Sequence, residues 1–186
     1  MTTDDCEAVA TVRVRGWQFA YAGMMPQSYL DAMSVAEDAE KRRDFFERGR
    51  GRVTNVVAVR AGAVVGWGCI GPSRDEGATA EQGELYAIYV LPEQVSTGVG
   101  RALMAQLNRR AEADGFRSMR LWVLKENDRA RRFYERAGFL PDGAEEPYDV
   151  EGVAVPEVRY VRQLGGQGLP GRADYSAGTQ PPELWS

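Results

Sequence analysis

The chain of 186 residues is 44% hydrophobic and 27% charged, which suits one globular domain around one core. Its net charge of -4 provides no concentrated basic face, so no nucleic-acid partner is expected. The absence of histidine excludes Ser-His-Asp and Cys-His catalysis and the usual imidazole metal sites, so no metal is expected either.

The first part of the chain predicts helices. Apolar residues recur near helical spacing after an acidic start, which predicts a helix over residues 5–22. A proline in its first turn marks a short helical segment over residues 26–33. A more charged helix over residues 34–48 ends at Gly49. We expect these helices to cover one face of a sheet.

From residue 53 the pattern changes to that of strands. Two β-rich runs, residues 53–59 and 63–70, are separated by the tight turn at residues 61–62 and predict an antiparallel hairpin. Residues 71–83 contain glycine, proline and several acids, which predicts a mobile loop. A third strand is predicted over residues 84–90.

The junction after this third strand has the features of a phosphate site. The strand breaks at Pro92, and Gly98 and Gly100 open a helix that closes near Gly115. The apolar stripe of that helix consists of Val99, Leu103, Leu107 and Ala111. A loop with free backbone N–H groups, glycines that admit close approach and the positive end of a helix dipole together favour a pyrophosphate.

The C-terminal part continues the alternation of strands and helices. Residues 119–124 predict a strand, and Asn127 can cap a helix that Gly138 ends. A last sheet region starts at Phe139 and includes a closing strand within residues 153–164. Strand, helix, strand and helix after an antiparallel hairpin predict a mixed α+β sheet.

Residues 1–164 therefore predict a single domain, and the Gly/Pro-rich residues 165–186 predict a flexible tail. Cys6 and Cys69 lie far apart and form neither a metal-type pair nor a disulfide framework, which indicates a reducing compartment. The acidic N-terminus lacks signal-peptide features, and no run approaches membrane-spanning length. We expect a cytoplasmic protein without membrane association.

Two segments together resemble the GCN5-related N-acetyltransferases, the GNAT family. They are residues 90–103, with the Gly-Val-Gly-Arg-Ala-Leu helix entry, and residues 121–139, with Asn-Asp-Arg-Ala-Arg-Arg-Phe-Tyr. The resemblance extends over most of the chain to Leu164. It implies the GNAT acyl-CoA N-acyltransferase fold, a mixed and mostly antiparallel central sheet flanked by helices. Members usually open with a strand, whereas only residues 1–3 precede the first helix here, so either that strand is vestigial or the given start is late.

The resemblance implies acetyl-CoA as acyl donor and no metal. The family's pyrophosphate loop reads Gln or Arg, Gly, any residue, Gly, any residue, then Gly or Ala. The first two places depart, because Val95 offers no side-chain donor and Ser96 replaces a glycine while adding a hydroxyl. A splay or bulge of the central strand, as in the family, would free backbone groups near Tyr89 and Val90. The cofactor residues implied are Ile88, Tyr89, Val90, Val95, Ser96, Thr97, Gly98, Val99, Gly100, Arg101, Ala102, Asn127, Ala130 and Phe133.

The implied reaction is direct attack of a primary amine on the thioester in a ternary complex. An amine of pKa near 10 is only about 0.1% free base at neutral pH, so a group must accept its proton. Without histidine, the candidate is a carboxylate acting through water, and Glu84 occupies the family's position for it, although a solvated strand end also explains this residue. Tyr134 matches the tyrosine that protonates the departing thiolate, with a packed helix aromatic as the alternative.

The acceptor is left open by the sequence. Apolar and aromatic candidates for its pocket, each explained as well by core packing, are Trp17, Tyr21, Met24, Met25, Tyr29, Trp67 and Tyr86. Acidic candidates for its rim are Glu145, Glu146, Asp149 and Glu151. The leading hypothesis is a small-molecule amine, with protein N-termini or lysines as the alternative within the class.

Two other classes stay open. The first is a non-catalytic acyl-CoA-binding regulatory module, which the departures at Val95 and Ser96 support. The second and weaker one is a Rossmann-type dinucleotide binder, which lacks the expected first glycine and follows antiparallel strands. A homodimer is common in the family and also stays open.

Overall fold

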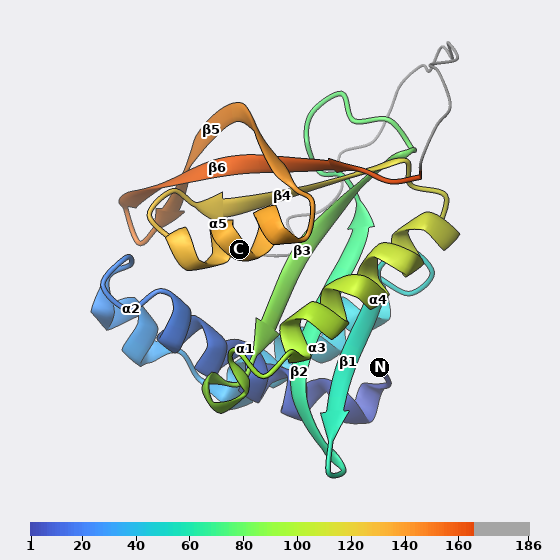
Figure 1. The fold of residues 1–186 in the computed structure, drawn as a ribbon. Helices are drawn as coiled ribbons and strands as arrows, with labels where there is room; N and C mark the ends of the chain where they lie inside the picture. The colour runs from blue at the N-terminus through green and yellow to red at the C-terminus, as the bar shows by residue number, and fades with distance from the viewer. Residues whose placement is uncertain (166–186) are drawn as a thin grey trace.

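The strands of the computed structural model, which describes residues 1–165, form one sheet in the order β1-β2-β3-β4-β6-β5 (Figure 1). All neighbouring strands are antiparallel except β3 and β4, which run parallel. The predicted mixed α+β sheet is therefore confirmed. The strands are β1 (Thr54–Arg60), β2 (Ala63–Pro72), β3 (Gln82–Val90), β4 (Ser118–Leu124), β5 (Leu140–Val150) and β6 (Val153–Gln163).

The helices begin and end close to the predicted bounds. Ser34 and Asn127 cap their helices, because the side-chain oxygen of each accepts a backbone N–H from the first turn. Before the first helix the chain forms a short 3-10 turn, Thr3–Asp5, rather than a strand. The helices are α1 (Cys6–Ala20), α2 (Gln27–Ala32), α3 (Val35–Arg48), α4 (Val99–Ala113) and α5 (Asp128–Arg136), with a second 3-10 turn at Pro92–Gln94.

Two further expectations concern membrane-spanning segments and the C-terminal tail. Within residues 1–165 no helix is both long enough and apolar enough to cross a bilayer. The predicted tail, apart from Gly165, lies outside the described residues.

The loop predicted over residues 71–83 is shorter than expected and is tied to the sheet. β2 continues to Pro72 and β3 starts at Gln82, which leaves residues 73–81 as the connection. Arg74 pairs with Glu84 of β3, and Asp75 accepts hydrogen bonds from side chains on β4 and β6. The expectation of a mobile loop over residues 71–83 is therefore corrected: ion pairs to distant strands hold residues 74 and 75. The sequence could not predict these pairs, because their members lie far apart in the chain.

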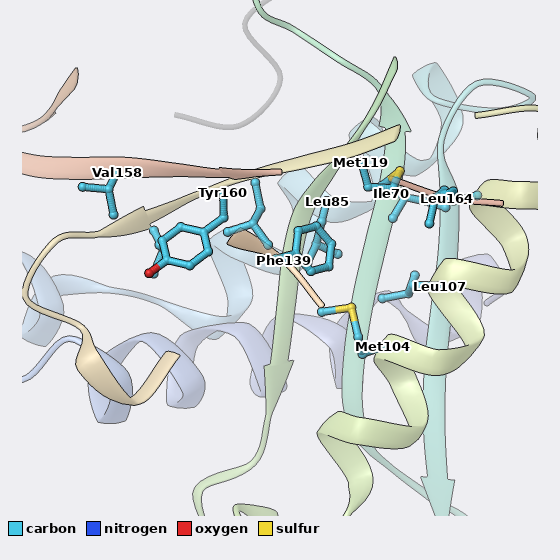
Figure 2. Packing of buried hydrophobic residues seen from close by; sticks show 12 residues of the cluster. Ile70, Leu85, Met104, Leu107, Met119, Phe139, Val158, Tyr160 and Leu164 are labelled. Carbon is cyan, nitrogen blue, oxygen red and sulfur yellow. The ribbon is translucent and has the colours of Figure 1, made fainter. Parts of the chain in front are cut away.

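The core lies between the helices and the two faces of the sheet. All four predicted stripe residues of α4 are buried. α4 lies close to β2 because Gly66 and Gly68 have no side chains there; an added Cβ at Gly68 would come within 2.7 Å of the Leu107 Cδ1 atom. Figure 2 shows Met104 and Leu107 of α4 in one cluster with Ile70, Leu85 and Phe139.

The sheet opens between its two parallel strands. The β3–β4 ladder contains only the pairs of Gln82, Gly83 and Glu84 with residues 118–120, although β3 continues to Val90. The two strands diverge beyond this short ladder in Figure 1. A register shift against β2 places a bulge at Tyr86, before the Tyr89–Val90 region where the sequence resemblance placed it. Residues 85–90 thus face an opening on the β4 side.

Candidate functional site

The loop between β3 and α4 presents backbone N–H groups to solvent. Gly98 has φ of 92° and Ser96 has φ of 63°, so the backbone turns through left-handed conformations before α4. Near the positive end of the helix dipole, free N–H groups form a cradle suited to a diphosphate. Among residues 95–102, the N–H groups for which the described part of the chain offers no acceptor are those of Ser96, Gly98, Val99, Gly100 and Arg101.

Other predicted loop residues have N–H groups that are already bonded. The N–H of Val95 bonds to Pro92 O, that of Thr97 to Gln94 O, and that of Ala102 to Gly98 O. These residues shape the loop instead of contributing free donors. Ser96 keeps the left-handed conformation expected of the family's glycine, at a cost of about 1–2 kcal/mol for a residue with a Cβ.

Arg60, at the end of β1, holds this loop and was missed by the sequence analysis. Its guanidinium donates to Gln94 Oε1 at 2.8 Å, to Thr97 Oγ1 at 3.3 Å and to the Thr97 carbonyl at 3.4 Å. The only sequence signal is an arginine at a hairpin end, which gives no indication of a partner 37 residues away. Arg60 is therefore a positioning residue for the loop.

Replacing Arg60 with Ala is expected to weaken coenzyme A binding about tenfold, because each lost hydrogen bond of a charged donor contributes about 1.5 kcal/mol or more. Isothermal titration of coenzyme A into both proteins measures the change. Arg50→Ala is the matched control, because Arg50 is exposed and pairs with Glu47 on α3 and not with the loop. Equal dissociation constants for Arg60→Ala and the control would contradict the positioning role.

The helix α5 brings other predicted cofactor residues to the opening. Asn127 is buried, and its Oδ1 atom accepts the Ala130 N–H at 3.0 Å, so its predicted cap is confirmed. Its Nδ2 group donates to no side chain or carbonyl within residues 1–165. The Phe133 ring lies beside Gly100, where its Cε2 atom would be 3.5 Å from an added Cβ.

Tyr134, on α5, packs its ring against Phe133 and Phe139 at the edge of the core. Burial raises the pKa of its phenol, and the neighbouring Tyr89 and Glu157 raise it further. Its hydroxyl makes no hydrogen bond within residues 1–165. Tyr134 therefore remains protonated at neutral pH and has a hydrogen available for donation.

Glu84, the predicted base, lies at the end of the short β3–β4 ladder and is only 2% exposed. Its Oε1 atom accepts hydrogen bonds from Arg74 Nε at 3.0 Å and Nη2 at 2.5 Å, and its Oε2 atom accepts the Arg74 backbone N–H at 2.9 Å. Both carboxylate oxygens of Glu84 are therefore engaged by one residue.

A cavity of about 810 Å³ opens beside the break in the sheet. Its apolar and aromatic walls include Trp17, Tyr21, Met25 and Tyr86, which the sequence analysis named, whereas Trp67 lies in the core. Met24 and Tyr29 pack in the cluster around Leu30 rather than in the cavity wall. The further aromatic lining residues are Tyr89, Trp122 and Tyr148.

Carboxylates line the same cavity. Of the predicted rim acids, Glu145 and Glu146 line it, while Asp149 and Glu151 lie at the β5–β6 turn outside the lining. Glu157, on β6, was missed by the sequence analysis. It lies directly opposite Glu146 in the β5–β6 ladder, and burial together with Glu146 raises the pKa of Glu157 to about 7.

Comparison with known proteins gives concordant results. Residues 18–139 match the family described as the acetyltransferase (GNAT) family. The chain is 33% identical over 156 residues to the uncharacterized N-acetyltransferase YuaI of Bacillus subtilis, covering 83% of this chain and 86% of that protein. It is 24% identical over 139 residues to a spermidine N(1)-acetyltransferase of Thermoplasma acidophilum, and the match covers 75% of this chain and 84% of that protein.

Solved structures share the fold. The PaiA N-acetyltransferase of Thermoplasma acidophilum, in complex with coenzyme A, has a TM-score of 0.70 at 20% identity, covering 88% of this chain and 96% of that one. YncA of Salmonella typhimurium, a putative acetyltransferase solved with acetyl-CoA, has a TM-score of 0.72 at 20% identity, and the match covers 93% of this chain and 96% of that one. The fold implied by the sequence resemblance is confirmed.

Proposed function

The chain belongs to the GNAT family of acetyltransferases, and on this premise we propose that it transfers the acetyl group of acetyl-CoA to the primary amine of a small cationic molecule. The observation that carries the proposal is the cavity beside the β3–β4 break, because carboxylates and aromatic rings line it together. Ionised carboxylates attract ammonium groups, and aromatic faces add a cation–π attraction.

Acetyl-CoA supplies the acetyl group as a thioester, the bond that breaks while the new amide bond forms. The free N–H groups of the loop at residues 96–101 would hold its diphosphate, and the Asn127 Nδ2 group would donate to the pantetheine arm. Unpaired backbone groups of residues 85–90 lie where the thioester and the pantetheine amides would bind. The Tyr134 hydroxyl would donate its proton to the departing sulfur.

A small acceptor is favoured over a protein acceptor by the form of the site. The cavity is lined from α1, the 73–81 loop and strands β3 to β6, and these enclose a volume that suits a molecule of modest size. The relative named as a spermidine N(1)-acetyltransferase, by that name, acts on a small amine, which supports the same class here.

The test is thiol release from acetyl-CoA across a panel of diamines, polyamines, amino sugars and amino acids, with coenzyme A binding measured in parallel. We expect coenzyme A binding and turnover with at least one small amine, and product mass increased by one acetyl group. Binding without turnover on this panel, but with acetylation of peptide N-termini or lysines, would favour the protein acceptor. Binding with neither would favour the regulatory module, and no binding would contradict the proposal as a whole.

A further inference from the structure

Glu157 differs from several carboxylates of the cavity in its partners. Glu84, Asp75 and Glu145 each accept hydrogen bonds from an arginine or lysine side chain. In the described part of the chain, Glu76, Glu146 and Glu157 have no such partner, and of these Glu157 is the one on β6, on the inner wall of the cavity. A carboxylate without a cation has lone pairs available to a ligand.

The position of Glu157 is fixed by regular strand pairing on both sides of β6. It is paired with Leu124 of β4 and with Glu146 of β5, so the backbone that carries it is held by two ladders. Its neighbour Val158 faces the opposite side, into the core, which turns Glu157 toward the cavity.

We infer that Glu157 is the carboxylate that accepts the proton of the acceptor ammonium, in place of Glu84, which is occupied by Arg74. This inference rests on the proposed function. It assigns a catalytic role to a residue on β6, which is separated from β3 by β4 in the sheet and contributes to the lining of the cavity.

The surroundings of Glu157 suit a proton acceptor at neutral pH. Burial is the largest cause of its raised pKa, followed by the charge of Glu146 on β5; Glu84 on β3 acts in the same direction and Arg74 in the opposite one. Of the other charged groups that line the cavity, Asp75 is bonded to Arg159 and Glu145 to Lys125, and Glu76 is the remaining one. A base is most efficient when its pKa lies near the working pH, and Glu157 has a pKa of about 7.

The proposed step is balanced in protons and bonds. One N–H proton of the ammonium moves to the Glu157 carboxylate, and the neutral amine forms the C–N bond as the C–S bond breaks. The sulfur takes the Tyr134 hydroxyl proton, and the second N–H proton of the amine restores that phenol. Glu157 then returns its proton to water, so that one proton is released for each amide formed.

The experiment is the pH dependence of kcat/KM with the best amine of the panel, for the wild type and Glu157→Gln. We expect the wild-type profile to rise with an apparent pKa near 7, and the variant to lose this limb and about 100-fold in rate. Glu146→Gln is expected to keep the limb but move it to lower pH, because removal of the neighbouring negative charge favours ionisation of Glu157. Glu84→Gln is expected to keep the limb as well, with a smaller shift to lower pH, because Glu84 contributes less than Glu146 to the raised pKa of Glu157.

The assignment of Glu157 as the proton acceptor would be overturned if the rise of kcat/KM near pH 7 persisted in Glu157→Gln. It would also be overturned if that rise disappeared in Glu84→Gln instead. Either result would leave the acetyltransferase activity standing. Absence of turnover with every amine would overturn the proposed function itself.

Thermal unfolding checks the fold of the Glu157→Gln variant. Because a raised carboxyl pKa in the folded state means that stability falls as pH rises through about 7, Glu157→Gln should gain in unfolding temperature over the wild type at pH 8 and not at pH 4.

Discussion

Replacing Tyr134 with Phe is expected to lower kcat between about 100- and 1000-fold, while the dissociation constant of coenzyme A stays within about twofold of the wild-type value. The phenol contributes a proton to the leaving sulfur in the transition state, whereas its ring packs against Phe133 and Phe139 and is retained in Phe. Because the pKa of Tyr134 is raised, the phenol is protonated throughout the neutral range, and the loss should be equally large from pH 6 to pH 9.

Steady-state thiol release and coenzyme A titration measure the two quantities. Tyr29→Phe is the matched control, because Tyr29 packs beside Trp17 outside the cavity lining and should retain wild-type kcat. A Tyr134→Phe variant with unchanged kcat would show that the ring packs but the hydroxyl does no chemistry. A parallel loss of kcat and coenzyme A affinity would indicate a role in binding instead.

Replacing Arg74 with Met is expected to lower the free energy of unfolding by about 2 kcal/mol. Removing one member of a buried ion pair typically costs about 3–5 kcal/mol, and we reduce this value because the Arg74 side chain is 38% exposed. The cost arises because Glu84, at 3% side-chain exposure, loses its cationic partner and the two hydrogen bonds that the Arg74 side chain donates, while the bond from the Arg74 backbone N–H is retained. Urea unfolding followed by circular dichroism measures the change.

A double-variant cycle separates this structural role of Glu84 from a catalytic one. Glu84→Gln in the Arg74→Met background should restore about half or more of the lost stability, because the amide needs no counter-charge. If Glu84 served only chemistry, Arg74→Met would leave stability unchanged. Arg117→Met is the control, because Arg117 forms a comparable but exposed pair with Glu81, worth less than about 1 kcal/mol.

The sequence predicted most of the local structure. The helix over Val99–Ala113 follows from an apolar residue at every fourth position, and the cap at Asn127 follows from a side chain that competes well for the first N–H groups of a helix. These features depend on residues within one or two turns of each other, so they are visible in the sequence. The order of the strands and the contacts of the loop at residues 73–81 depend on partners far away in the chain, so they are not visible in the sequence.

In the candidate site, too, some residues could be predicted from local motifs and others could not. The loop at residues 95–102 and Tyr134 were named from motifs whose members are close in sequence. Arg60, by contrast, reaches Thr97 across the end of the sheet, and Glu157 meets the cavity because β6 inserts between β4 and β5. Neither residue belongs to a local motif.

The amino-acid sequence by itself determined the element types, the glycine-rich entry to α4 and the family, because short-range spacing encodes each of them. Only the tertiary structure decided which carboxylates of the cavity are engaged by a cation and which are not. Glu84 and Glu157 are both glutamates on strands, but Arg74 folds over the first, and the second has Glu146 as its cross-strand neighbour. The availability of an acid depends on the charges packed around it, and those charges come from elements far apart in the chain.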